Sequence, residues 1–280
     1  MREINVNKII KVVKEMSMEA NFLLPEDVKN KIQECKENET WPIGKNILGK
    51  ILLNVDISKN EEVPMCQDTG MICLFVDIGQ EVHIEGGNLE DALNEGIRQG
   101  YKEGYLRKSI VIDPLRRVNT KDNTPGVIYY SIVPGDIFAI TLAPKGFGSE
   151  NMSQLKMMKP SDGVEGIKEF VLQVIKDAGP NPCPPTIVGI GIGGTFDRVA
   201  LLAKKALIRP IDVRNPDKFY SKLEDQLLES INNLGIGPQG FGGNTTALAV
   251  NIETYPTHIA GLPVAVNINC HVSRHVSRKI

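Results

Sequence analysis

The sequence predicts an α+β fold in which a helical N-terminal portion precedes a mixed α/β body with short β-sheets. Apolar residues recur at helical spacing through residues 5–55, whereas short β-branched and apolar runs, separated by glycine and proline turns, dominate from residue 72 onward. We therefore expect a helical subdomain over residues 1–60 and an α+β body over residues 61–280. With 280 residues, 41% of them hydrophobic, the chain is long enough to bury a sizeable core.

Three helices are predicted in the N-terminal portion. The first carries apolar side chains at helical spacing from Ile9 to Met16. The second is expected to begin at Pro25, because the fixed φ of proline suits the first turn of a helix. The third covers the apolar residues 43–53.

The body is predicted to alternate strands with helices. Strands are expected at residues 72–76, 82–84, 127–133, 137–142, 186–192, 248–252 and 264–268. Helices are expected at residues 88–104, 163–178, 196–207 and 216–234, the first of them capped by Asn88. The strands at 127–133 and 137–142 are expected to pair as a hairpin, because Pro134-Gly135-Asp136 is a typical turn sequence.

Composition argues against several classes of function. The formal net charge of −2 lacks the basic excess of a nucleic-acid-binding protein. The longest apolar runs are far too short to span a membrane, and the N-terminus begins an amphipathic pattern rather than a secretory signal. We therefore expect a cytoplasmic protein that binds neither nucleic acid nor membranes.

The five cysteines carry the strongest chemical signal. An odd number argues against a disulfide framework, and the lack of a C-x-x-C motif argues against zinc-ribbon and thioredoxin-like sites. Cys66, Cys183 and Cys270 fall in loops or at strand ends, whereas Cys73 falls within an apolar strand and Cys35 within a charged helix. Because thiolates favour iron–sulfur clusters over hard cations, a three-cysteine cluster and ordinary structural cysteines both remain open at this point.

A glycine motif offers the main rival interpretation. Gly189-x-Gly191-x-x-Gly194 follows a predicted strand and precedes a predicted helix, as in dinucleotide-binding folds, with Asp212 roughly twenty residues further on. The second parallel strand that should end at that acidic residue is missing, however. Glycines that let a helix pack against a strand explain the match equally well, so a nucleotide-binding oxidoreductase is kept as a remote alternative.

Two further segments carry polar or basic side chains. The glycine-rich residues 145–151 are compatible with an anion-binding nest of backbone N–H groups or with an ordinary hairpin exit. His83 is expected to be structural, and His271 and His275 have the i,i+4 spacing of a metal pair. Without an acidic partner, the basic tail from Arg274 onward is expected to contact a partner or solvent, and a non-catalytic metal-binding module there is a third alternative.

Four segments together form a recognisable combination. They are Cys66-Gln67-Asp68-Thr69-Gly70, Lys145-Gly146-Phe147-Gly148-Ser149-Glu150-Asn151, Gly189-Ile190-Gly191-Ile192-Gly193-Gly194 and Asn269-Cys270-His271. In combination they resemble the class I fumarate hydratases, and more narrowly the α-subunit shared by two-subunit fumarases and L-tartrate dehydratases. The resemblance runs across nearly the whole chain and implies the N-terminal domain of the family's fused form, present here as a separate subunit.

The resemblance implies a [4Fe–4S] cluster held by three cysteines, which by motif position are Cys66, Cys183 and Cys270. The fourth iron then has no protein ligand. It binds the hydroxyl and a carboxylate of the substrate and acts as a Lewis acid that makes hydroxide a better leaving group. An exposed iron of this kind also implies sensitivity to oxygen.

The resemblance also implies roles for residues beside the cluster. Gln67 and Asp68 are expected to face the substrate, with Asp68 orienting or activating the base that removes the C–H proton. Arg107 is expected to bind a substrate carboxylate, as a guanidinium does well, with Arg116 and Arg117 as neighbours that fit the same role less securely.

Two more residues and a partner follow from the resemblance. Gly148 is expected to offer a backbone contact to the substrate, and His258 matches a histidine of the family near the site, where we expect a catalytic role. The base, a threonine, and the remaining cations are expected on a separate β-subunit in an α2β2 assembly. The implied reaction is the reversible hydration of fumarate to (S)-malate, with dehydration of L-tartrate to oxaloacetate as the alternative.

Overall fold

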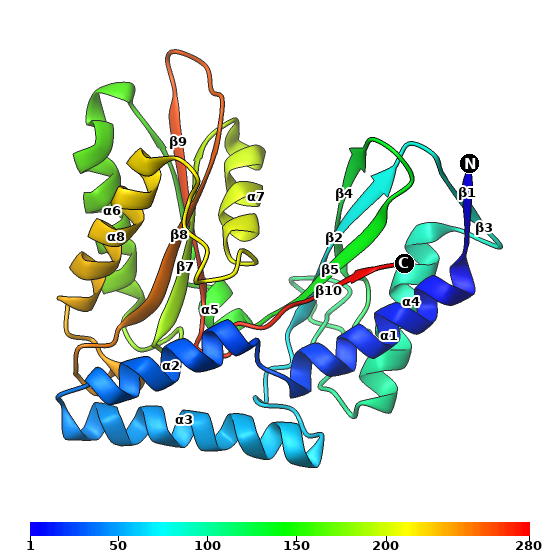
Figure 1. Ribbon diagram of the computed structural model, residues 1–280. Coiled ribbons are helices and arrows are strands. Elements are labelled where there is room, and N and C mark those ends of the chain that lie inside the picture. The colour runs from blue at the N-terminus through cyan, green and yellow to red at the C-terminus, as the bar shows by residue number, and fades with distance from the viewer. The chain divides into compact units, whose positions relative to one another are not determined.

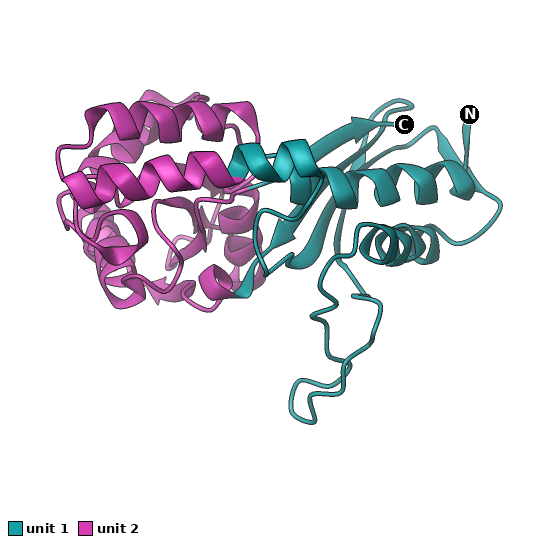
Figure 2. Ribbon diagram, turned by 90° about the horizontal axis from the view of Figure 1, so that it is seen from below, with its two compact units in different colours: residues 1–24, 55–147, 274–280 teal, residues 25–54, 148–273 magenta.

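The computed structural model describes residues 1–280 and divides the chain into two compact units (Figure 2). Unit 1 comprises residues 1–24, 55–147 and 274–280, and unit 2 comprises residues 25–54 and 148–273. The α+β class is confirmed. The predicted division at residue 60 does not coincide with these units, because the first predicted helix belongs to unit 1 and the second to unit 2.

Unit 1 is a four-stranded sheet with two helices on one face (Figure 1). Its strand order is β10 (Val276–Lys279), β5 (Phe138–Lys145), β2 (Met71–Gly79) and β4 (Val127–Val133). The helices are α1 (Val6–Phe22) and α4 (Leu89–Glu103), and their apolar faces pack on alternate residues of the strands. The predicted cap of α4 is confirmed, since the Asn88 side chain accepts hydrogen bonds from the N–H groups of Glu90 and Asp91.

The predicted hairpin between residues 127–133 and 137–142 is wrong, although both strands form. β2 lies between them, parallel to β4 and antiparallel to β5. The physical reason is burial: Ile72, Leu74 and Val76 of β2 are completely buried, which suits a central strand, whereas β4 is only half-buried and takes the edge.

Three short strands of the structure were not predicted. β1 (Arg2–Asn5) pairs in parallel with β3 (Val82–Glu85), so the predicted strand at 82–84 exists but does not pair with β2. The other two are β10 and β6 (Gln154–Met158), both at sheet edges.

Unit 2 has a second four-stranded sheet with helices on both faces. Its strand order is β6, β9 (Leu262–Asn269), β7 (Thr186–Gly193) and β8 (Ala247–Tyr255). Figure 1 shows α6 (Gly163–Ala178) and α8 (Lys218–Asn232) on one face and α7 (Phe196–Ala206) on the other. The remaining helices are α2 (Glu26–Asn38), α3 (Pro42–Glu61), of which residues 42–54 belong to this unit, the short α5 (Phe147–Glu150), and 3-10 turns at Pro160–Asp162 and Pro238–Gly240.

The glycines of the dinucleotide-like motif serve helix–strand packing. A Cβ on Gly189 would lie 2.3 Å from the carbonyl oxygen of Ala203, and one on Gly191 would lie 2.3 Å from that of Val199. Helix α7 therefore occupies the space directly over β7. This close approach accounts for the motif without a bound nucleotide. No helix of the structure is both long and apolar enough to cross a bilayer.

Replacing Gly191 with alanine should destabilise unit 2, because the new methyl group would overlap the Val199 carbonyl of α7. We expect a loss of about 2–3 kcal/mol in the free energy of unfolding, as for overpacked cores, measured by urea denaturation followed by circular dichroism. Gly49→Ala is the matched control, since its Cβ would meet only the Lys36 side chain at 3.5 Å. Equal stability of the two variants would contradict the packing role of Gly191.

Candidate functional site

The segment Cys66–Gly70 forms a tight turn between α3 and β2 in unit 1. Cys66 is half-buried, and Gln67 is exposed. Gly70 has a φ of +80°, and a Cβ there would lie 2.8 Å from the backbone nitrogen of Lys145. Only glycine meets both conditions, so this residue fixes the close approach of the turn to the end of β5.

The Asp68 carboxylate is held in place by backbone donors. One oxygen accepts a hydrogen bond from the N–H of Gly70 at 2.9 Å, and the other accepts one from the N–H of Phe147 at 2.8 Å. The Asp68 carbonyl oxygen accepts a hydrogen bond from the Arg274 guanidinium at 2.8 Å. Arg274 is only 4% exposed, so the expectation that the basic tail from Arg274 onward contacts a partner or solvent is wrong for this residue.

Buried polar side chains also hold the carbonyl groups at the end of the turn. The Tyr101 hydroxyl donates to the carbonyl oxygen of Thr69 at 2.7 Å and lies 2.9 Å from that of Gly70. The Asn123 amide donates to the Gly70 carbonyl as well, at 3.1 Å. Burial raises the pKa of Tyr101, so its hydroxyl keeps the proton that it donates. No sequence pattern indicated Tyr101 or Asn123, because their partners lie far away along the chain.

Arg107, the predicted carboxylate-binding residue, lies beside the same turn. The Thr69 hydroxyl oxygen lies 3.0 Å from the Arg107 backbone nitrogen, from which it accepts, and 3.2 Å from the Arg107 carbonyl oxygen, to which it donates. The Arg107 side chain is exposed. Arg116 lies further along the same connection between α4 and β4, where it forms an ion pair with Asp113. Of the neighbouring arginines considered, Arg107 is therefore the one tied to the turn that carries Gln67 and Asp68.

Cys183 and Cys270 lie at one end of the sheet of unit 2. Cys183 sits in an exposed loop just before β7, with a φ of +55°, and Cys270 directly follows β9. The antiparallel register pairs Ile187 with Asn269, which brings the start of β7 beside the end of β9. The two cysteine segments are thus neighbours, although 87 positions separate them in the sequence.

His271 and Gln239 tie these two segments together. The His271 Nδ1 atom lies 3.0 Å from the carbonyl oxygen of Cys183, to which it donates when it carries the ring proton. The Gln239 side chain donates to the carbonyl oxygen of Pro184 at 2.8 Å, and its backbone N–H reaches the same oxygen at 2.7 Å. The i,i+4 spacing with His275 suggested a metal pair for His271, and no pattern indicated Gln239, because both residues contact partners distant in the sequence.

His258 lies away from both cysteines of its unit. It occupies the connection between β8 and β9, where its ring accepts a hydrogen bond from the N–H of Ala260 at 3.2 Å. The register that brings Cys270 beside Cys183 leaves His258 at the opposite end of β9, roughly 25 Å away by the rise of an eight-residue strand. Its catalytic role stays a prediction from the resemblance alone.

Gly148 lies in α5, close to the loop of Cys183. A Cβ on Gly148 would be 3.5 Å from the carbonyl oxygen of Asn181. The end of α5 is anchored by Glu150, whose carboxylate accepts hydrogen bonds from Lys204 at 2.6 Å and Asn267 at 2.7 Å. Residues 147–150 thus form one helical turn rather than an open nest, and the substrate contact of Gly148 stays a prediction.

Comparison with known proteins identifies the family. A family model described as fumarate hydratase (fumerase) matches residues 10–279. The chain belongs to the fumarate hydratase family. It is 46% identical over 280 residues to a putative L(+)-tartrate dehydratase subunit alpha of Methanocaldococcus jannaschii, with 98% of each chain covered. It is 34% identical over 273 residues to the L(+)-tartrate dehydratase subunit alpha of Escherichia coli strain K12, with 96% of this chain and 89% of the relative covered.

The thiols of this fumarate hydratase family member fall into two groups. None of the five cysteines forms a disulfide, and only Cys73, within β2, is fully buried; Cys35, Cys66, Cys183 and Cys270 are at least partly accessible. Burial raises the pKa of Cys35 to about 11, so this thiol stays protonated. Iron–sulfur clusters take thiolate ligands, a role for which Cys35 and the fully buried Cys73 are poorly suited. Within neither unit do three cysteine, histidine or acidic side chains converge as metal ligands would. Cys66 belongs to unit 1, and Cys183 and Cys270 belong to unit 2.

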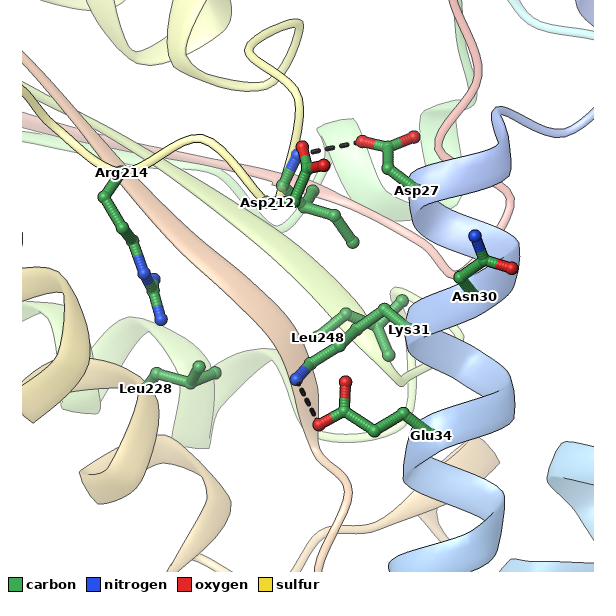
Figure 3. A pocket seen from close by; sticks show the side chains of 9 residues that line it. Asp27, Asn30, Lys31, Glu34, Asp212, Arg214, Leu228 and Leu248 are labelled. Carbon is green, nitrogen blue, oxygen red and sulfur yellow. Dashed lines mark hydrogen bonds and ion pairs between the residues drawn. The ribbon is translucent and has the colours of Figure 1, made fainter.

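A cavity of about 330 Å³ lies elsewhere in unit 2, between α2, α8, β8 and the segment 211–214 (Figure 3). None of the predicted site residues lines it. Its charges are compensated locally: Lys31 pairs with Glu34 at 2.8 Å, and Asp27 accepts a hydrogen bond from the N–H of Ile211 at 2.9 Å. The cavity is therefore separate from the cysteine loops.

The two groups of thiols should differ in reactivity. In iron-free, chelator-treated protein at pH 8, iodoacetamide should modify Cys183 first and Cys35 far more slowly. With a pKa of about 11, Cys35 is only ~0.1% thiolate at that pH, against roughly a quarter for an ordinary thiol of pKa about 8.5. Mass spectrometry of peptides after quenching measures the rates. Equal rates for Cys35 and Cys183 would show that the burial of Cys35 does not control its ionisation.

Proposed function

We propose that the chain is the α-subunit of an iron–sulfur hydro-lyase acting on a four-carbon hydroxydicarboxylate. The family match over residues 10–279 is the observation that carries this proposal. The state of the thiols supports it: the three cysteines named by motif position are at least partly accessible, whereas Cys73 is buried and burial raises the pKa of the partly accessible Cys35 to about 11.

Cys66, Cys183 and Cys270 are the proposed ligands of a [4Fe–4S] cluster. Three thiolates leave one iron without a protein ligand, and such a centre supplies Lewis acidity toward a substrate hydroxyl. Of the proposed ligands, Cys66 belongs to unit 1, and Cys183 and Cys270 belong to unit 2. Loops and strand ends, where all three thiols lie, are the usual location of functional residues.

The remaining proposed roles belong to side chains of the Cys66–Gly70 turn and its neighbour Arg107. The exposed Arg107 guanidinium binds a substrate carboxylate, and Gln67 donates to the substrate from the adjacent position. Asp68 presents a carboxylate whose two oxygens are each fixed by a backbone N–H, which suits a group that orients the base and the proton that it removes. Gly148 offers a backbone contact near Cys183.

L(+)-tartrate is the substrate to test first. The relatives named above are tartrate dehydratase α-subunits, which favours dehydration of tartrate to oxaloacetate over the fumarate reaction that the sequence analysis put first. Reversible hydration of fumarate to (S)-malate is the second candidate, supported by the description of the family. The two hydroxydicarboxylates differ by one hydroxyl group.

A separate β-subunit is the proposed partner, in an α2β2 assembly. The relatives are named as α-subunits, which supports a second kind of chain. In this proposal the β-subunit supplies the catalytic base and further cations, so that the α-subunit alone carries the cluster but is inactive.

The cluster ligands can be tested without measuring activity. Anaerobically reconstituted Cys66→Ser, Cys183→Ser and Cys270→Ser variants should each lose the cluster, measured as iron and sulfide content and by electron paramagnetic resonance after reduction. Cys35→Ser and Cys73→Ser are the matched controls and should retain it. A cluster that survives loss of any one of the three proposed ligands, or that is lost equally in the controls, would refute the assignment.

The reaction can be tested with the co-expressed β-subunit under anaerobic conditions. We expect consumption of L(+)-tartrate with formation of oxaloacetate, and a decrease in kcat of about 10²-fold or more for Asp68→Asn with the cluster intact. Asp136→Asn, a change of the same kind in the exposed turn between β4 and β5, is the control and should keep kcat. A cluster-loaded complex that dehydrates neither tartrate nor malate would rule out the proposed function.

A further inference from the structure

The connection between α4 and β4, residues 104–126, contains an ordered hairpin that we call the arm (residues 105–121). In Figure 2 it corresponds to the long loop of unit 1 that stands away from the sheet and helices of that unit. Its two sides are joined by backbone hydrogen bonds from Ile112 to Val118 at 2.7 Å and from Thr120 to Ile110 at 2.9 Å. The Asp113 carboxylate closes the tip by accepting from the N–H groups of Leu115 and Arg116. The arm is thus a defined structure of its own.

The arm exposes large apolar side chains. Leu115 is 90% exposed, Tyr105 91%, Ile112 74% and Val118 57%. Single exposed hydrophobic residues are ordinary, but four within one projecting hairpin form a concentrated apolar surface. Such a surface is typical of a segment that becomes buried against another protein chain.

The arm is also basic. It carries five cationic side chains and only one acidic one, and that one, Asp113, is engaged in the turn at the tip. The cationic residues are Arg107, Lys108, Arg116, Arg117 and Lys121. The matching surface must therefore be apolar at its centre and acidic at its rim. An isologous contact between the arms of two identical chains would place these like charges opposite one another, which disfavours a second copy of this chain as the occupant.

The base of the arm is tied to the proposed site. Thr69, in the turn that carries Cys66 and Asp68, exchanges hydrogen bonds with the backbone of Arg107. Asn123, fully buried, accepts a hydrogen bond from the N–H of Ser109 at 2.7 Å and donates to the carbonyl oxygen of Gly70. The segments on both sides of the arm are therefore fastened to the Cys66–Gly70 turn. A chain that binds the arm meets the edge of the same turn.

We infer that the arm is the docking element for the partner subunit, which receives Ile112 and Leu115 in an apolar pocket with an acidic rim. The inference rests on the proposed function for the existence of a β-subunit. The arm then has a double role: it contributes Arg107 at its base and recruits with its tip the chain that completes the site.

The test measures association of the full-length chain with the β-subunit encoded in the same genome, by isothermal titration calorimetry under anaerobic conditions. Ile112→Asp combined with Leu115→Asp should weaken binding at least tenfold, with an unchanged melting curve for the free chain. Arg116→Glu combined with Arg117→Glu should slow association and reduce its dependence on salt. Ile132→Asp, at a position that is 76% exposed outside the arm, is the matched control and should bind as the wild type does.

Unchanged affinity of the arm variants for the β-subunit would overturn the inference. Arm variants that no longer self-associate but still bind the β-subunit would also overturn it, because the partner of the arm would then be a second copy of this chain. The proposed function fails in a different way: the wild-type chains bind through the arm, but the complex holds no cluster or dehydrates no substrate. If the wild-type chain does not bind the β-subunit at all, both the docking inference and the proposed function are wrong.

Discussion

The antiparallel register of β7 against β9 is the constraint on which the site in unit 2 depends. It joins Ile187 to Asn269 and so brings the loop before one strand beside the loop after the other. A slip of one residue would exchange Val264, Val266 and Ile268, which pack beneath α6 and α8, with Ala265, which packs against α7 on the other face, so the alternation of large and small side chains protects the position of Cys270. The same register separates His258 from the two cysteines by the length of a strand.

Polar side chains then fix the positions of the cysteine loops. In unit 1, Tyr101, Asn123 and Arg274 each donate to a backbone carbonyl of the Cys66–Gly70 turn. In unit 2, His271 and Gln239 do the same for the carbonyl groups of Cys183 and Pro184. In the buried part of the unit 1 turn, the Thr69 and Gly70 carbonyl groups would each carry a desolvation cost of about 1–3 kcal/mol without these donors. Both cysteine loops are thus held by side chains that need never touch a ligand.

Local signals in the sequence predicted most elements but not their pairing. Asn88 caps α4 as expected, and the β-branched run at 186–192 forms β7, because capping and strand propensity act between neighbours in the chain. The turn sequence between β4 and β5 is typical of a hairpin, yet these strands do not pair with each other. The more apolar β2 lies between them and pairs with both. Which strand takes the centre depends on the total burial of the sheet, and no short segment encodes that.

In the candidate site, too, residues with a local sequence signal were predicted and residues with only long-range contacts were not. The thiols of Cys66, Cys183 and Cys270 stood out by sequence context, and Cys73 was correctly expected within an apolar strand. The supporting residues did not stand out, because Tyr101 and His271 act on partners distant in sequence. The prediction for Arg274 was wrong for a related reason. A run of basic residues suggests a solvated surface, and only the tertiary structure reveals that Arg274 is buried.

The interleaving of the units has a consequence for biosynthesis. Unit 1 contains the N-terminal helix α1, yet its sheet is finished by β10, which pairs with β5 and follows every element of unit 2 in the chain. During translation β5 therefore has an open edge until the final strand leaves the ribosome, and Asp68 lacks the Arg274 contact for the same interval. The unit that begins first is completed last, so the Cys66–Gly70 turn gains its full set of contacts only after every element of unit 2 has been synthesised.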